Sequence, residues 1–119
     1  MDNYSKSSYY SEGLLEEAIQ ENIRKLESDP NNHMLRCSLA NSYFRIGKID
    51  EAIKEYRKCI EIAPSSEYWN NLGKALLNVG QYDEAVNAFK QVLTKNKWPD
   101  AHFHLALAHK SAGNSEEAL

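Results

Sequence analysis

The chain has 119 residues, of which 42% are hydrophobic, so it is long enough and apolar enough to fold as one domain around a buried core. Lys and Arg number 14 against 17 Asp and Glu, and the resulting net charge of −3 disfavours binding to nucleic-acid phosphates. No apolar run approaches the roughly 20 residues that cross a bilayer, and residues 1–12 lack a secretory signal, which together predict a cytoplasmic protein without a membrane segment.

Four glycines divide the chain into repeating units. Gly13, Gly47, Gly80 and Gly113 are separated by 34, 33 and 33 residues, and an alanine follows each of them five residues later. A leucine and then a small residue precede the last three glycines at a constant distance, as Leu39–Ala40, Leu72–Gly73 and Leu105–Ala106. A fixed period of roughly 20–50 residues is the sequence signature of a repeat architecture.

In chain order, residues 1–12 lack these columns and are rich in Ser, Asn and Tyr, so they form either a flexible tail or a degenerate first helix. Residues 13–32 match the second half of a unit. Residues 33–65 and 66–98 are complete units, and residues 99–119 begin a third unit whose second helix starts just before the sequence ends. We therefore expect the native protein to continue with further repeats or another domain.

Each complete unit predicts two helices joined by a tight turn. In residues 66–98, Trp69, Leu72 and Leu76 share one helix face, because their spacing follows the i, i+3, i+7 rule. Gly80, like the other three repeat glycines, is expected to end a helix, since glycine accepts the left-handed conformation that closes a helix. Asp83, and Asp50 one unit earlier, are suited to cap the following helix.

The second helix of each unit is predicted to pack closely on the first. Its buried face comprises Ala85, Phe89, Val92 and Leu93, and one period earlier Ala52, Tyr56, Cys59 and Ile60. Small residues stand where the two helices face each other, in the pairs Ala40/Ala52, Gly73/Ala85 and Ala106/Ala118. Pro30 and Pro64 follow the second helices and prevent their continuation.

The motif Trp69-x-x-Leu72-Gly73, followed by Ala85-x-x-x-Phe89, resembles the tetratricopeptide repeat. The resemblance covers residues 13–119. It implies an all-α fold, a right-handed solenoid of antiparallel helix pairs with about six to seven helices.

The resemblance also implies that the first helices of successive units line a concave groove, which holds an extended peptide or a partner helix. The predicted groove residues are Asn41, Phe44, Arg45, Asn70, Asn71, Lys74, Asn78, Phe103, His104 and Leu107. Asparagine amides suit this role because each offers both a donor and an acceptor to a peptide backbone. The alternative is that these side chains are ordinary solvated helix faces.

Some members of this family hold the acidic carboxyl-terminal tails of chaperones in a clamp of two asparagines and three cations. The corresponding positions here are Cys37, Asn41, Asn71, Asp100 and His104, so both asparagines are present and all three cations are missing. Because charge-assisted contacts to carboxylates are the strong ones, we expect no tight binding of such a tail.

No catalytic, cofactor or metal site emerges from the sequence. His102, His104 and His109 lie within eight residues, but on a helix His104 points away from the other two, and no Glu or Cys completes a zinc site. Neither Cys37 nor Cys59 has a base at a readable spacing. The two cysteines form no CxxC pattern, which favours reduced thiols over a disulfide.

We therefore predict a non-catalytic scaffold that binds a peptide or helix of another protein, with self-association through exposed terminal repeats as a further expectation. The alternative is the recognition arm of a larger enzyme, such as a transferase or phosphatase, with catalysis encoded beyond Leu119.

Overall fold

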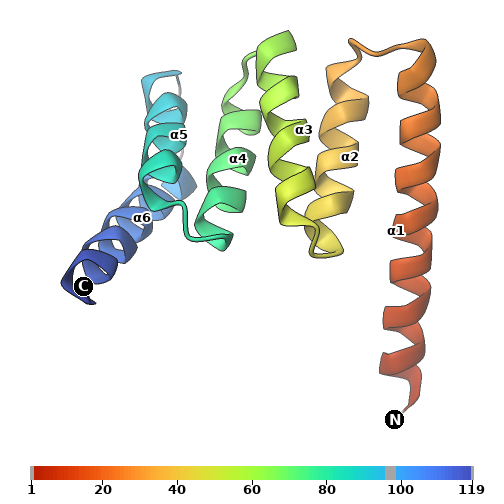
Figure 1. Ribbon diagram of the computed structural model, residues 1–119, viewed down its shortest axis with the longest axis horizontal. Helices are drawn as coiled ribbons and strands as arrows, with labels where there is room; N and C mark the ends of the chain where they lie inside the picture. Colours follow the sequence, from red (N-terminus) through yellow and green to blue (C-terminus); the bar gives the residue numbers. More distant parts are fainter. Residues whose placement is uncertain (1, 96–98, 119) are drawn as a thin grey trace.

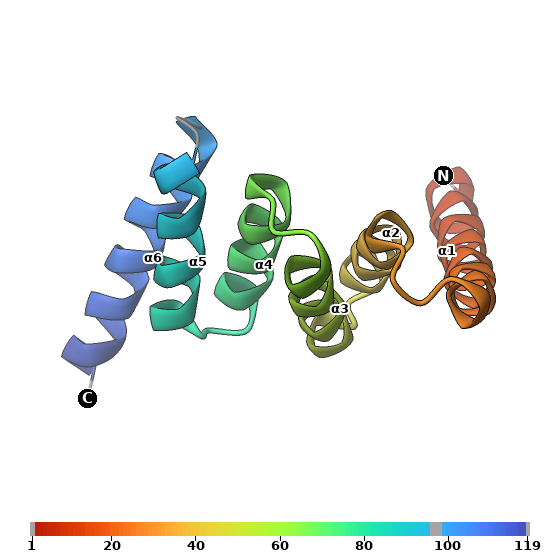
Figure 2. The same ribbon diagram turned by 90° about the horizontal axis from the view of Figure 1, so that it is seen from above.

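Six helices follow one another along the chain in the computed structural model, which describes the backbone of residues 2–95 and 99–118 and the side chains of residues 13–94 and 102–113. They are α1 (Asp2–Ser28), α2 (His33–Arg45), α3 (Ile49–Ile62), α4 (Ser66–Asn78), α5 (Tyr82–Lys95) and α6 (Pro99–Ala118), and the described residues contain no strand. Each helix packs on its neighbour in the chain, and α4 also contacts α6. The helices form one row with α1 at one end and α5 and α6 at the other (Figures 1 and 2). This arrangement confirms the predicted all-α stack of helices.

The turns inside the two complete units are built on glycine. Gly47 and Gly80 have φ of 88° and 79°, the left-handed region in which a side chain would be strained. The residue after each glycine donates its backbone N–H back to the helix, from Lys48 to the Tyr43 carbonyl at 2.8 Å and from Gln81 to the Leu76 carbonyl at 2.9 Å. These hydrogen bonds satisfy carbonyls at the ends of α2 and α4, as the glycine spacing predicts.

The other two repeat glycines do not end helices, so this part of the prediction is wrong. Gly13 lies inside α1 and Gly113 inside α6, and no neighbouring atom lies within 4 Å of the Cβ that either would carry as alanine. Glycine inside a helix costs only about 1 kcal/mol relative to alanine, so a glycine does not end a helix by itself. It does so where a following helix packs back on the first. Residues 2–12, expected as a tail or a degenerate helix, belong to α1.

Capping also differs from the expectation. Asp50 and Asp83 lie in the first turns of α3 and α5, where they complement the helix dipole but do not cap it. The side-chain caps are Asn32, which accepts from the Leu35 backbone N–H at 3.1 Å, and Ser65, which accepts from that of Tyr68 at 3.3 Å. Both precede a first helix, and each satisfies a backbone donor that the helix itself cannot.

Small residues bring the paired helices together. Ala40, Ala52 and Ala85 are fully buried, and a Cβ on Gly73 would lie 2.6–2.9 Å from three ring atoms of Phe89. Phe89 is itself fully buried, so its ring occupies the space that the missing Cβ leaves. In α6 the corresponding Ala106 is exposed, and the side chain of its expected partner Ala118 lies outside the described residues.

An ion pair takes the place of an aromatic contact in the first complete unit. Arg36 stands one period before Trp69, and its Nη1 donates to Glu55 Oε1 at 3.0 Å and Oε2 at 3.3 Å. The Arg36 and Glu55 side chains are 16% and 10% exposed. One period later Ala88 stands in the column of Glu55, and it lines the same cavity as Trp69. The same position thus holds an ion pair in the first unit and apolar side chains in the second.

Among residues 2–95 and 99–118, no helix has both the length and the apolar character needed to span a membrane.

Gly73→Ala is expected to destabilise the fold by about 1–3 kcal/mol, because the new Cβ overlaps the buried Phe89 ring. Gly13→Ala is the matched control, and we expect it to stabilise the protein by about 0.5–1 kcal/mol because its Cβ enters open space in a helix. Urea unfolding followed by circular dichroism measures both. Equal effects of the two substitutions would contradict the close approach of α4 and α5.

Glu55→Ala is expected to cost about 3 kcal/mol of unfolding free energy, because it leaves the largely buried Arg36 guanidinium without its partner. The double variant Arg36→Trp/Glu55→Ala reproduces the residues of the second unit and should unfold within about 1 kcal/mol of wild type. A double variant as unstable as Glu55→Ala alone would refute the equivalence of the two sites.

Candidate functional site

A cavity of about 320 Å³ lies between α2, α3 and α4. Its lining residues are Asn41, Phe44, Arg45, Tyr56, Asn71 and Lys74. The structure therefore brings together five of the ten predicted groove residues, since all but Tyr56 were predicted. Tyr56 was assigned to the buried face of its helix, and it is only 3% exposed. Its signal in the sequence is the hydroxyl, which the equivalent Phe89 lacks.

A hydrogen bond from Tyr56 fixes the orientation of the Asn41 side chain. The Tyr56 hydroxyl donates a hydrogen bond to Asn41 Oδ1, and Asn41 Nδ2 lies 3.9 Å from Cys37 Sγ. Burial raises the pKa of Tyr56, so its hydroxyl stays protonated and acts as a donor at neutral pH. The Asn41 side chain is thus held in one orientation at the edge of the cavity, while the residue remains solvent-exposed.

The two buried thiols are unsuited to nucleophilic chemistry. Burial, reinforced by the Glu67 carboxylate, raises the pKa of Cys37 to about 11, although hydrogen bonds from Asn41 and Asn71 oppose this shift. Burial likewise raises the pKa of Cys59 to about 12. A thiol with such a pKa is almost wholly protonated at neutral pH, whereas the nucleophile is the thiolate.

The cavity is cationic. Arg45 and Lys74 line it from α2 and α4, both are exposed, and none of the six lining residues is acidic. The amides of Asn41 and Asn71 lie on the same two helices. The arrangement offers hydrogen bonds to a peptide backbone and positive charge to a carboxylate.

The other five predicted residues lie outside this cavity. Asn70 is buried, and within the described part of the chain its Oδ1 has no hydrogen-bond partner. Asn78 is exposed at the end of α4. On α6, Phe103 and Leu107 are 67% and 42% exposed, whereas the His104 ring stacks on Phe89 with 5.4 Å between centroids. Of these five residues, His104 thus contacts the core.

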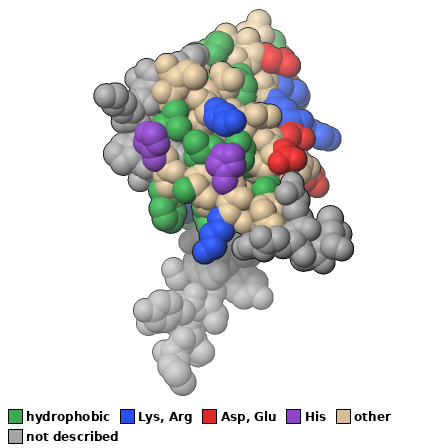
Figure 3. Space-filling model, turned by 90° about the vertical axis from the view of Figure 1, so that its left-hand side faces the viewer, with side chains coloured by type: hydrophobic (Ala, Val, Ile, Leu, Met, Phe, Trp, Pro, Cys, Tyr) green, Lys and Arg blue, Asp and Glu red, His purple; other side chains and the backbone are tan. Residues whose placement is uncertain are grey.

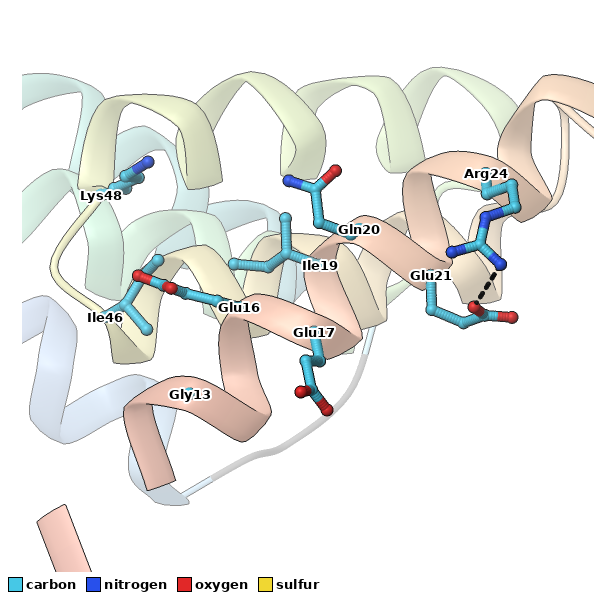
Figure 4. A pocket seen from close by; sticks show the side chains of 9 residues that line it. All are labelled: Gly13, Glu16, Glu17, Ile19, Gln20, Glu21, Arg24, Ile46 and Lys48. Carbon is cyan, nitrogen blue, oxygen red and sulfur yellow. Dashed lines mark ion pairs between the residues drawn. The ribbon is translucent and has the colours of Figure 1, made fainter. Parts of the chain in front are cut away.

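Two further cavities lie elsewhere. One of about 490 Å³ is lined by Arg57, Ile60, Trp69, Leu72, Leu76, Glu84, Asn87 and Ala88. The other, of about 710 Å³, lies between α1 and the turn after α2 and is lined by Gly13, Glu16, Glu17, Ile19, Gln20, Glu21, Arg24, Ile46 and Lys48 (Figure 4). Sequence reasoning missed both as sites. It assigned Trp69 and its neighbours, which line the first of these two cavities, to the core. Within the described residues, no three His, Cys, Asp or Glu side chains come together to hold a metal ion.

A model of the tetratricopeptide repeat matches residues 31–95, which is more than half of the chain. The chain belongs to the tetratricopeptide repeat family. The match spans both complete units, including every residue that lines the 320 Å³ cavity.

Relatives in this family are much longer proteins. The human intraflagellar transport protein 88 homolog is 24% identical over 120 residues, which cover 96% of this chain and 14% of that protein. Heat shock protein STI1 of Saccharomyces cerevisiae is 34% identical over 67 residues, which cover 56% of this chain and 11% of that protein. The chain thus spans a small part of the length of these two relatives.

Solved tetratricopeptide repeat structures share the fold. MamA superposes with a TM-score of 0.82 at 26% identity, covering 93% of this chain and 66% of MamA. The second such domain of human RPAP3, solved with the HSP70 peptide SGPTIEEVD, has a TM-score of 0.77 at 25% identity, covering 91% of this chain and 92% of that domain. The first such domain of Spaghetti (RPAP3), solved with the HSP90 peptide SRMEEVD, has a TM-score of 0.80 at 20% identity, covering 92% of this chain and 89% of that domain.

Alkaline pH is expected to destabilise the protein through its buried thiols. The unfolded chain releases the thiol protons near the ordinary pKa of 9.0, whereas the folded chain retains them up to about 11 for Cys37 and about 12 for Cys59. Because the folded state then binds more protons, the free energy of unfolding falls as pH rises above 9.0 and is steady below it.

Urea unfolding at a series of pH values, up to the ordinary tyrosine pKa of 10.0, measures this fall. In Cys37→Ala/Cys59→Ala the decline over this range should become shallower, whatever the variant's stability at neutral pH. An unchanged slope in the double variant would show that the thiols are not its cause.

Proposed function

We propose that this chain is a non-catalytic scaffold whose 320 Å³ cavity binds an extended peptide segment of a partner protein. The observation that carries the proposal is the convergence of Asn41, Asn71, Arg45 and Lys74 on one cavity whose six lining residues include no acidic side chain. Two amides on adjacent helices can bond successive peptide groups of an extended chain, independently of its sequence. The two cations add a preference for a carboxylate in the bound segment.

The cavity has the size and chemistry for recognition rather than for a reaction. Its volume lies at the lower limit of small-molecule sites, which span about 300–1,000 Å³, so it accommodates one or two side chains of a longer peptide. Phe44 supplies an apolar contact for such a side chain. The nearby Cys37 thiol is buried and protonated, so it does not act as a nucleophile.

The relatives support protein partners as a class. The RPAP3 domains were solved bound to HSP90 and HSP70 peptides that end in an aspartate. The cation positions of that clamp differ here, because Cys37 is a buried neutral thiol and His104 stacks on Phe89. Arg45 and Lys74 are cations at other positions, so we infer a peptide whose carboxylate lies inside the sequence rather than a chaperone tail.

The proposal has two further parts and one alternative. The protein works in the cytoplasm, consistent with two buried cysteines that are free thiols. It self-associates through its terminal helices. The alternative is that the same groove serves a larger enzyme, such as a transferase or phosphatase, as a recognition arm.

Asn71→Ala is expected to weaken peptide binding by about two- to tenfold, the loss of one hydrogen bond worth about 0.5–1.5 kcal/mol. Lys74→Glu should weaken it further, because it reverses a charge in the cavity. The probe is a peptide selected from a random phage-displayed library on the wild-type chain, with binding measured by calorimetry.

Asn87→Ala is the matched control, since it also truncates an asparagine, but one that lines the 490 Å³ cavity. We expect it to bind the selected peptide as wild type does. Loss of binding in Asn87→Ala with full binding in Asn71→Ala would move the site to the other cavity. Tight binding of SRMEEVD that Asn71→Ala abolishes would instead establish a chaperone-tail site.

A further inference from the structure

The last helix of the row carries an exposed apolar stripe. Phe103, Ala106, Leu107 and Lys110 follow the i, i+3, i+4, i+7 spacing, and all four are exposed. Figure 3 shows this end of the molecule, where hydrophobic and histidine side chains share one face. Residues at the column of Phe103 are buried one and two periods earlier, since Cys37 and Asn70 are 7% and 8% exposed. Nothing within the described residues covers the stripe on α6.

The opposite end of the row exposes the complementary half of a helix pair. α1 carries the columns of a second helix, because Ala18 precedes the buried Ala52 by 34 residues. Ala52 is buried at the point where its helix faces Ala40 of the first helix, whereas the equivalent Ala18 is partly exposed. Leu14 on α1 and Met34 on α2 are 65% and 72% exposed at this same end. α1 packs on the row through a small separate cluster that includes Ile19, Leu26 and Leu39.

From these two ends we infer that a second copy of this chain docks its α6 against α1, so that copies stack head to tail. The inference deepens the self-association stated under the proposed function and names its two surfaces. In each complete unit a first helix pairs with the second helix that follows it. α6 is a first helix and α1 is a second helix, so a pair formed between copies repeats the pair inside each complete unit.

Contacts inside the chain predict contacts between copies, because equivalent columns meet in each unit. Arg36 pairs with Glu55, and the equivalent residues at the two ends are His102 of α6 and Glu21 of α1. The small pair of Ala40 and Ala52 corresponds to Ala106 and Ala18. The stack thus places a basic side chain against a carboxylate and two small residues at the point of closest approach.

Asn71 and Cys37 extend the same mapping, because they lie close together on two successive first helices. One copy's Phe103 stands in the column of Cys37, and Ser38 of the next copy stands in the column of Asn71. Ser38 is exposed, so the Phe103 ring can lie over it and reach the exposed Met34 one turn away.

Charged residues of the two ends also fall within reach of each other in this pairing. The exposed stripe on α6 includes Lys110, whereas the acidic residues of α6, Asp100, Glu116 and Glu117, lie toward its two ends. α1 presents Glu17 and Glu21 on its exposed side, and Glu21 pairs with Arg24 at 3.0 Å (Figure 4). A carboxylate accepts several hydrogen bonds at once, so Glu21 can keep Arg24 while it contacts His102 of another copy.

The contact is heterologous, because α6 of one copy meets α1 of the other. A head-to-tail contact leaves one free surface at each end of every complex, so wild-type chains grow into larger oligomers. A single helix pair buries less than the roughly 1,200 Å² of a stable interface, so growth requires high protein concentration. The measurement is the weight-average mass by sedimentation equilibrium over a concentration series of the 119-residue chain.

Two variants block one end each. Phe103→Glu/Leu107→Glu places charge on the α6 stripe, and Ala18→Arg fills the contact point on α1. We expect both to remain monomeric at concentrations where wild type associates. When the two are mixed, the intact α6 of one and the intact α1 of the other should form a heterodimer that grows no further. Ile62→Glu, which alters an exposed apolar residue at the end of α3, is the matched control and should associate as wild type does.

Wild type that stays monomeric throughout the series overturns the inference. Association of Ala18→Arg alone overturns it too, because it would indicate contact between two α6 helices. A mixture of the two variants that stays monomeric, or loss of association in Ile62→Glu, also overturns it. Circular dichroism melting confirms that each variant is folded. Peptide binding by Ala18→Arg is measured in parallel, because the 320 Å³ cavity does not include α1. Failure of stacking and failure of groove binding are therefore distinguishable.

Discussion

The close approach of the two helices in each pair is the constraint on which the rest of the structure depends. Gly73 leaves room for the Phe89 ring, and Ala40 and Ala52 provide the corresponding contact in the first unit. Larger side chains at these points would push the second helix outward. Because the paired helices stay close, Tyr56 reaches from α3 to the Asn41 amide on α2 and orients it. The proposed recognition surface is therefore a consequence of core packing.

Sequence periodicity predicted the helices and five of the six residues that line the candidate cavity, because both follow from spacing along one helix. Asn41, Phe44 and Arg45 share a face of α2, and that face lines the cavity together with Asn71 and Lys74 of α4. Features that depend on partners distant in sequence were missed. The Arg36–Glu55 pair joins residues 19 apart, and its meaning appears only when the two helices are side by side. Gly113 carries the same local signal as Gly80, yet packing rather than composition decides whether the helix ends there.

The two units use the same architecture for different surfaces. The first unit fills its outer column with the Arg36–Glu55 ion pair, whereas in the second unit Trp69 and Ala88 line the 490 Å³ cavity. The groove column shows the reverse, with exposed Asn41 followed one period later by exposed Lys74. A repeat fold permits such changes because each unit contacts only its neighbours, so surface residues vary while the small residues between helices keep the spacing. Family membership therefore establishes the fold, whereas recognition depends on a few side chains of this chain.

The most direct test of the central claim is to locate a bound peptide by NMR. In a titration of the isotope-labelled chain with a library-selected peptide, the account predicts that the side-chain amide signals of Asn41 and Asn71 shift. The indole N–H signal of Trp69, which lines the other cavity, should stay in place. Shifts of the Trp69 indole with unmoved asparagine signals would contradict the account and place recognition on the opposite side of α4.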